Sequence, residues 1–210
     1  MPNTVDPEKT ESRERKNLVN LPDDFYERIK GRLRRRICRE LRPAGQLLDL
    51  GCGSCELEHL LAEQNGTHVI GVDISDEKFP DSNSRSDGVE CRKADAGNLD
   101  FAEDRSMDAV VCVYALHEIA EPLNALKEAR RVLRKQGRIL IVDFPRDSLA
   151  QRLWNEQYYT WPQVASMLRR CGFVEVQART IFQDQLIWAL ARAPDSACSD
   201  QPPDATAQNQ

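Results

Sequence analysis

The chain has 210 residues, a formal net charge of −5 and 40% hydrophobic residues. That length suits one domain with a substantial core and is short for two. The acidic balance gives no overall attraction to nucleic acid or to an anionic membrane. No apolar run approaches the roughly 20 residues that cross a bilayer, and residues 1–20 lack the apolar centre of a signal peptide. We therefore expect a cytoplasmic protein with no membrane partner.

Composition separates the two ends of the chain from its middle. Residues 1–20 are polar, and residues 194–210 are rich in Pro, Asp, Ser, Gln and Ala, so we expect both ends to be disordered. Residues 21–193 then form one folded domain. The 7 cysteines are an odd number and are scattered through apparent strands and helices, which favours reduced thiols over a disulfide framework.

The first predicted element is a helix over about residues 22–42. Apolar side chains recur there every four residues and define one packed face: Phe25, Ile29, Leu33, Ile37 and Leu41. The same segment carries a basic run: Arg28, Lys30, Arg32, Arg34, Arg35, Arg36, Arg39 and Arg42. A solvated helix face explains the basic run best, with a polyanionic partner as the alternative. Gly31 weakens the helix signal near its middle.

Apolar segments of strand length alternate with helical patterns through the rest of the domain. The predicted strands are 46–50, 68–73, 89–92, 108–113, 138–143, 173–179 and 185–192. This alternation predicts an α/β fold with a doubly wound, mostly parallel sheet. Residues 76–88 contain almost no apolar side chains, so we expect a short turn or irregular loop there.

Three helical patterns connect these strands. The first carries leucines at helical spacing and stops at Gly66. The second has one apolar face over residues 122–133, and Gly137 is expected to end it. The third begins with a capping box of Thr160 and Gln163 and stops at Gly172.

The run LLDLGCGSC, after the first predicted helix, indicates a ligand site. It joins a buried strand to a helix through Gly51 and Gly53, which can adopt backbone angles closed to other residues and let a ligand approach the backbone. Asp73 ends the next strand, where a carboxylate would meet ribose hydroxyls. Glu56 stands where a dinucleotide fingerprint requires its third glycine, which disfavours an NAD dehydrogenase.

Five segments then occur in order at familiar intervals: LLDLGCGS, VIGVDIS, CRKADAGNLDF, MDAVVCVYALHEI and EARRVLRKQGRILIVDF. Over residues 46–192 the chain resembles the class I S-adenosylmethionine-dependent methyltransferases, and within them the small-molecule enzymes similar to ubiquinone and menaquinone methyltransferases. The resemblance implies a seven-stranded Rossmann-like sheet whose last strand, 185–192, is antiparallel, with an N-terminal helical cap. It also implies an enzyme that uses S-adenosyl-L-methionine.

The resemblance assigns the adenosine half of the cofactor to the ends of the second and third strands. Asp73 would take the ribose diol, with Ile74 against the adenine. Asp95 would accept from the exocyclic amine, and Ala96 would donate its backbone N–H to the ring.

The methionine half would lie at the first and fourth strands. Val113 and Tyr114 would flank it, and Cys55 departs from the small residue that the family usually has at that position. Backbone and water contacts would come from four residues at the end of the first strand: Asp49, Gly51, Cys52 and Gly53.

Two further motifs have competing interpretations. Cys52 and Cys55 form a C-x-x-C, but no second ligand pair has matching spacing, so we expect no metal site. Methylation of a thiol-bound metalloid stays open. His117, followed by Glu118, comes just after the fourth strand, where an imidazole would be a candidate general base. The alternative for His117 is a packing or capping role.

The function predicted from these observations is methyl transfer to a small organic acceptor by in-line displacement. Acceptor contacts are expected from the N-terminal helix and from the connection 145–161, which includes Arg146, Arg152, Trp154, Tyr158 and Tyr159. The sequence disfavours nucleic acid, since no Asn/Asp-Pro-Pro-aromatic element follows the fourth strand, but ribose or carbon methylation of RNA remains an alternative. A non-catalytic cofactor-binding regulatory module is the rival from another class. The oligomeric state is left open.

Overall fold

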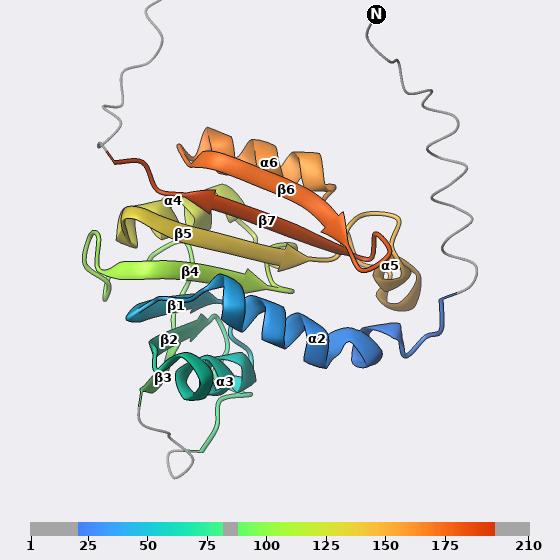
Figure 1. The fold of residues 1–210 in the computed structure, drawn as a ribbon, viewed down its shortest axis with the longest axis horizontal. Coiled ribbons are helices and arrows are strands. Elements are labelled where there is room, and N and C mark those ends of the chain that lie inside the picture. Colours follow the sequence, from blue (N-terminus) through green and yellow to red (C-terminus); the bar gives the residue numbers. More distant parts are fainter. Residues whose placement is uncertain (1–20, 82–87, 196–210) are drawn as a thin grey trace, which may run out of the picture.

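One seven-stranded sheet runs through the computed structural model, which describes residues 21–81 and 88–195 (Figure 1). The predicted disorder at the two ends falls on residues 1–20 and 196–210, outside the described residues. The strand order is β3-β2-β1-β4-β5-β7-β6. The strands are β1 (Gln46–Leu50), β2 (His68–Asp73), β3 (Val89–Lys93), β4 (Met107–Val113), β5 (Leu133–Asp143), β6 (Val174–Ile181) and β7 (Leu186–Arg192).

The first five strands are parallel, and the last two pair antiparallel. β1 pairs with both β2 and β4, so the chain reverses its direction of strand addition between β1 and β4. β7 lies between β5 and β6 and is antiparallel to both. The predicted Rossmann-like sheet is confirmed, and its reversal point opens a crevice at the carboxyl ends of β1 and β4.

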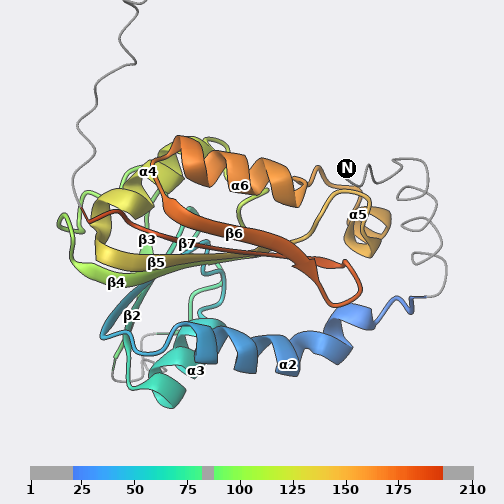
Figure 2. The same ribbon diagram turned by 45° about the horizontal axis from the view of Figure 1, so that its top comes forward.

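Helices cover both faces of this sheet (Figure 2). They are α2 (Phe25–Glu40), α3 (Glu56–Asn65), α4 (Pro122–Val132), α5 (Leu149–Trp154) and α6 (Trp161–Arg170). α4 and α6 lie on one face, while α2 and α3 lie on the other. Alternation along β1 serves both layers: Leu47 packs in the cluster of α2 and α3, and Leu48 packs in the cluster of α4 and α6.

The sequence patterns predicted α2 and α6 well and misplaced the end of α4. The capping box of Thr160 and Gln163 is formed at the start of α6. α2 continues without a break through Gly31. The second helical pattern was extended too far, because α4 ends at Val132 and Leu133 already pairs with Met107 as the first residue of β5. Leu133 continues the apolar helix face in sequence, yet its backbone is extended, so side-chain spacing alone could not locate this boundary.

Many basic side chains of α2 bind groups of the same chain. Arg34 and Lys30 both pair with Glu56 at the start of α3. The guanidinium of Arg36 lies 4.5 Å from the ring centroid of Trp188 on β7. These contacts give the basic run a role within the fold. No helix in the described part of the chain is long and apolar enough to cross a membrane.

Candidate functional site

The turn between β1 and α3 is held tightly against the neighbouring strands. The backbone N–H groups of Gly51 and Cys52 both donate to the carbonyl of Val72, at 2.8 and 3.0 Å. Gly51 has φ +81°, and a Cβ at this position would lie 2.3 Å from the Cβ of Ala115. Only glycine fits here, because any side chain would clash with the loop that follows β4.

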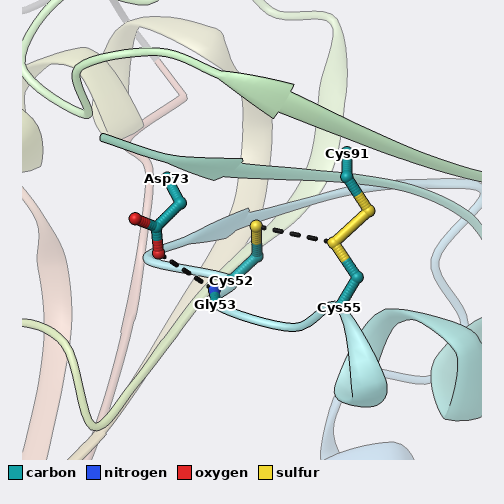
Figure 3. The surroundings of a disulfide bond; sticks show 5 residues. All are labelled: Cys52, Gly53, Cys55, Asp73 and Cys91. Atoms are coloured by element: carbon teal, nitrogen blue, oxygen red, sulfur yellow. Dashed lines mark hydrogen bonds between the residues drawn. A yellow bond between two sulfur atoms is a disulfide. The ribbon is translucent and has the colours of Figure 1, made fainter. Parts of the chain in front are cut away.

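Gly53 and Asp73 face an open space next to this turn. Gly53 has φ +53°, and a Cβ built there meets nothing within 4 Å. Its N–H donates to Oδ2 of Asp73 at 2.9 Å (Figure 3). The N–H of Ser75 donates to Oδ1 of Asp73 at 3.1 Å. Both carboxylate oxygens are thereby oriented, and each retains a lone pair that can accept from a ligand hydroxyl.

A cavity of about 660 Å³ opens beside Asp73. Its volume is in the range of small-molecule and cofactor sites. Most of the cofactor residues predicted from sequence line it: Gly51, Gly53, Asp73, Ile74, Asp95, Ala96 and Tyr114. The other predicted site residues lie next to it without lining it: Asp49, Cys52, Val113 and His117. Glu118, named above beside His117, also lines the cavity. The remaining lining residues were not singled out in the sequence: Val72, Ser75, Glu77, Lys78, Ala94, Ala115, Ile119, Ala120 and Glu121.

The end of the cavity beside β2 and β3 presents one apolar and one acidic group. Ile74 is 71% exposed, which is unusual for a large aliphatic side chain, and it lines the cavity. Asp95 is exposed, and its Oδ1 accepts the N–H of Gly97 at 2.8 Å in a tight turn. An aliphatic surface beside a carboxylate suits a flat heterocycle that carries an amino group.

Asp49 lies beneath the turn and pairs with a second acid, Glu58 on α3. The two residues are 3% and 0% exposed, and neither Oδ1 of Asp49 nor either carboxylate oxygen of Glu58 has a hydrogen-bond partner among the described residues. Burial, reinforced by the Glu58 charge, raises the pKa of Asp49 well above its usual value, and burial raises the pKa of Glu58. The pair therefore favours the protonated form more strongly than exposed carboxyl groups do. Glu58 was missed in the sequence, although an acid beside Leu57 and Leu61 on a helix face was an available signal.

The sulfur atoms near this turn differ from the prediction of reduced thiols. Cys55 and Cys91 form a disulfide that joins the start of α3 to β3, and the Cys52 sulfur lies 3.7 Å from that of Cys55 (Figure 3). The sequence could not reveal this pair, because 36 residues separate its members and only the placement of β3 brings them together. None of these cysteines lines the cavity.

His117 is enclosed by carboxylates. Its side chain is 4% exposed, with Nδ1 2.7 Å from Asp143 Oδ1 and Nε2 3.1 Å from Glu156 Oε2. Burial alone lowers the His117 pKa, but the hydrogen bond and charge of Asp143, assisted by Glu118 and Glu156, outweigh burial and raise it. The imidazole is thus oriented by a buried carboxylate, and its second nitrogen points toward the connection after α5.

An aromatic cluster borders the same end of the site. The rings of Tyr114 and Phe144 stack with centroids 4.4 Å apart, and Tyr26 of α2 stacks on Trp154 of α5 at 5.5 Å. Tyr158 also contacts Phe144, at 5.6 Å between centroids. The helix over residues 25–40 and the connection after β5 therefore meet beside Tyr114, which lines the cavity.

The sequence matches a family model described as a methyltransferase domain over residues 48–141. It is 31% identical over 169 residues to the demethylmenaquinone methyltransferase of Clavibacter sepedonicus, covering 65% of this chain and 68% of that relative. It is 34% identical over 110 residues to the 27-O-demethylrifamycin SV methyltransferase of Amycolatopsis mediterranei, covering 50% of this chain. That alignment spans 40% of the relative's own length.

The fold is also similar to a solved structure, phosphoethanolamine N-methyltransferase 2 of Haemonchus contortus in complex with S-adenosyl-L-methionine. The TM-score is 0.67, with 78% of this chain and 52% of the other covered. Sequence identity is 16%, so this likeness concerns the fold alone.

Proposed function

The chain belongs to the class I S-adenosylmethionine-dependent methyltransferases, and we propose that it transfers the methyl group of this cofactor to a small organic acceptor by in-line displacement. The observation that carries the proposal is the cavity at the ends of β1, β2 and β4, where a glycine turn and a carboxylate face one space. The bound cofactor supplies a sulfonium methyl that is already activated, so the protein's task is to bind and align.

For the adenosine half, we assign Asp73 to the ribose diol, because its oriented oxygens line the cavity. Ile74 provides the apolar surface for the adenine. Asp95 accepts a hydrogen bond from the exocyclic amine, and the backbone N–H of Ala96 donates to the ring. These three assignments place one half of the ligand along the ends of β2 and β3.

For the methionine half, the backbone of the turn and the end of β4 supply the contacts. The open space above Gly53 leaves room for the chain of the methionine, and Tyr114 borders the reacting end. Asp49 lies beneath the turn and supports its backbone. Cys52 contributes its backbone groups, and the side chain of Val113 packs at the end of β4. Burial raises the pKa of Tyr114, so its hydroxyl stays protonated and can donate to an acceptor.

His117 is the proposed general base, oriented by Asp143. A base must reach the acceptor through Nε2, which here contacts Glu156. Glu156 is 49% exposed at its side chain and belongs to the connection after α5, so binding of an acceptor can displace it. His117→Ala should then lower the methyl-transfer rate by about 10²–10⁴-fold at unchanged cofactor affinity. A folded variant with wild-type turnover would leave alignment as the sole source of catalysis.

The acceptor we propose is apolar or aromatic. The rings of Tyr26, Phe144 and Trp154 form a surface beside Tyr114 that suits such a molecule. Relatives named for demethylmenaquinone and demethylrifamycin, both small organic molecules, support this class.

The decisive experiment follows the methyl group itself. Purified chain is mixed with S-adenosylmethionine carrying a labelled methyl and a cell extract, and labelled metabolites are identified. Asp73→Ala should weaken cofactor binding at least about tenfold, since each charge-assisted hydrogen bond contributes roughly 1.5–3 kcal/mol, and should lower labelling in parallel. Asp104→Ala, far from the cavity in an exposed pair with Arg131, is the matched control. Absence of cofactor binding by calorimetry would contradict the whole proposal.

A further inference from the structure

Three cysteines from different elements lie close together beside the turn between β1 and α3 (the cofactor turn). Cys52 belongs to the turn after β1, Cys55 precedes α3, and Cys91 lies on β3 (Figure 3). Cys55 is fully buried, and its sulfur is within reach of both others. None of the three cysteines is among the residues that line the cavity.

Glu58 brings a carboxylate to the same place. One of its oxygens lies within 4.8 Å of the sulfurs of Cys52 and Cys55. The side chain is fully buried, and no amide, hydroxyl or amine of the described residues donates to it. A buried carboxylate without such donors is costly unless a proton or a cation neutralises it. Asp49 can share one proton but cannot satisfy both oxygens.

Gly71 on β2 makes the space into which these groups fit. A Cβ at this position would lie 2.7 Å from the Cβ of Cys52, 2.9 Å from Oε1 of Glu58 and 3.0 Å from the Cys52 sulfur. The thiol and the carboxylate are therefore packed together above a bare stretch of strand backbone. The absence of a side chain at Gly71 therefore allows Cys52 and Glu58 to lie this close together.

The spacing of the Cys52 and Cys55 sulfurs matches that of two thiolates on one tetrahedral metal ion. Zinc binds thiolate sulfur at about 2.3 Å, so two sulfurs on one tetrahedral zinc lie about 3.8 Å apart. The sulfurs of Cys52 and Cys55 are 3.7 Å apart. We propose that the reduced chain binds a zinc-type dication through four side chains: Cys52, Cys55, Glu58 and Cys91.

Cysteine binds a metal as the thiolate, so a dication at this site replaces the thiol protons. Asp49 lies beside Glu58 in the same buried layer, behind the carboxylate that would bind the metal.

Reduction must precede binding. A dithiol reductant transfers two electrons and two protons to the Cys55–Cys91 disulfide, yielding two thiols and the cyclised disulfide of the reductant. Zinc binding then displaces the protons of the three thiols into solvent, with no change in oxidation state of the metal. The disulfide and the metal are alternative ways of joining the cofactor turn to β3.

Metal binding by the full chain tests this directly. The chain is reduced by a dithiol without oxygen, freed of reductant and titrated with Zn²⁺ against a chromophoric chelator, and with Co²⁺ as a spectroscopic probe. We expect one Zn²⁺ per reduced chain, a thiolate-to-cobalt charge-transfer band and the visible bands of tetrahedral cobalt. The oxidised chain should bind at least tenfold more weakly. Equal binding by both forms, or no stoichiometric binding, overturns the proposal.

Variants identify the ligands. Cys91→Ser and Glu58→Gln should each weaken Zn²⁺ binding at least tenfold, and Cys91→Ser should also diminish the charge-transfer band. Cys171→Ser, which removes a buried free thiol beside α4, should change neither. Circular dichroism checks that each variant is folded, and the wild-type stoichiometry and cobalt spectrum decide the question if a variant is not. Unchanged affinity in folded Cys91→Ser and Glu58→Gln overturns the site.

Discussion

Asp49 and Asp143 are both buried near the carboxyl ends of parallel strands, but their partners differ. Asp143, 1% exposed, accepts from the imidazole and the backbone N–H of His117 and from the N–H of Phe144. Asp49, 3% exposed, faces the carboxyl of Glu58, and its Oδ1 has no hydrogen-bond partner among the described residues. Equal burial therefore accompanies an imidazole–carboxylate pair at one strand end and two facing acids with raised pKa values at the other.

This difference separates two kinds of support for the site. At the end of β5, the carboxylate of Asp143 is paired with the imidazole of His117, which it holds in one orientation toward the connection after α5. At β1, two acids face each other beneath the glycine turn, and neutrality depends on a proton or, as proposed above, a cation. The first arrangement is completed by protein groups alone, whereas the second needs a proton or a cation from solution.

The largest effect is expected from removing the imidazole. His117→Ala leaves Asp143 buried without its cationic partner, so the free energy of unfolding should fall by about 3–5 kcal/mol, toward the lower end because two backbone N–H groups remain. Urea denaturation measures it. The native His117 pKa is raised, so its contribution is fully present below about pH 6.5 and is lost as pH rises through the native pKa.

His68→Ala is the matched control for that experiment. The imidazole of His68 contacts the neutral side chain of Gln46 at 3.1 Å, so its removal leaves no buried charge unpaired. A loss of stability no larger for His117→Ala than for His68→Ala would contradict the ion-pair interpretation.

The second effect concerns the acid pair and has a pH signature. A carboxyl whose native pKa is raised binds more protons when folded, so stability falls with rising pH above its unfolded pKa of about 4, by up to about 1.4 kcal/mol per pH unit for each proton. Glu58→Gln can donate an amide N–H to Asp49 without a proton. It should raise the free energy of unfolding at pH 8 by about 1–2 kcal/mol and flatten its fall with pH.

Glu63→Gln serves as the control because Glu63 is exposed on the same helix, α3. Both variants are compared with the wild-type chain at one redox state, without added metal. Parallel pH profiles for Glu58→Gln and the wild type would show that the buried pair holds no proton.

Several residues proposed from the sequence, such as Gly51 and Asp73, line the cavity, whereas the partners of the buried acids were missed. Asp49 and Asp73 were singled out because a glycine turn or a strand end marks such positions locally. Asp143 ended a predicted strand and went unnoticed, since its importance arises only when β5 pairs with β4 and brings it to His117, 26 residues away. Partners supplied by a neighbouring strand carry no local signature.

The same reasoning explains the misplaced end of α4 and the missed disulfide. The apolar helix face continues through Leu133, but Met107 on β4 pairs with it and fixes its backbone as strand. Cys55 and Cys91 meet because β3 packs beside α3. In each case a tertiary contact overrode a pattern that was correctly recognised in the sequence.

The smallest effect is expected at the outer carboxylate of His117. Glu156 is half exposed at its side chain, so the pair it makes with Nε2 is screened by solvent, and Glu156→Gln should change the free energy of unfolding by less than about 1 kcal/mol. The glutamine oxygen can still accept from Nε2, but the negative charge is gone. The His117 pKa should therefore fall while staying above its ordinary value, because Asp143 contributes more than Glu156. NMR titration of the imidazole measures this, with Glu63→Gln as the control for loss of an acid. If the pKa returned to that of an exposed histidine, Glu156 would be the principal partner, and the contrast between Asp143 and Asp49 would lose its basis.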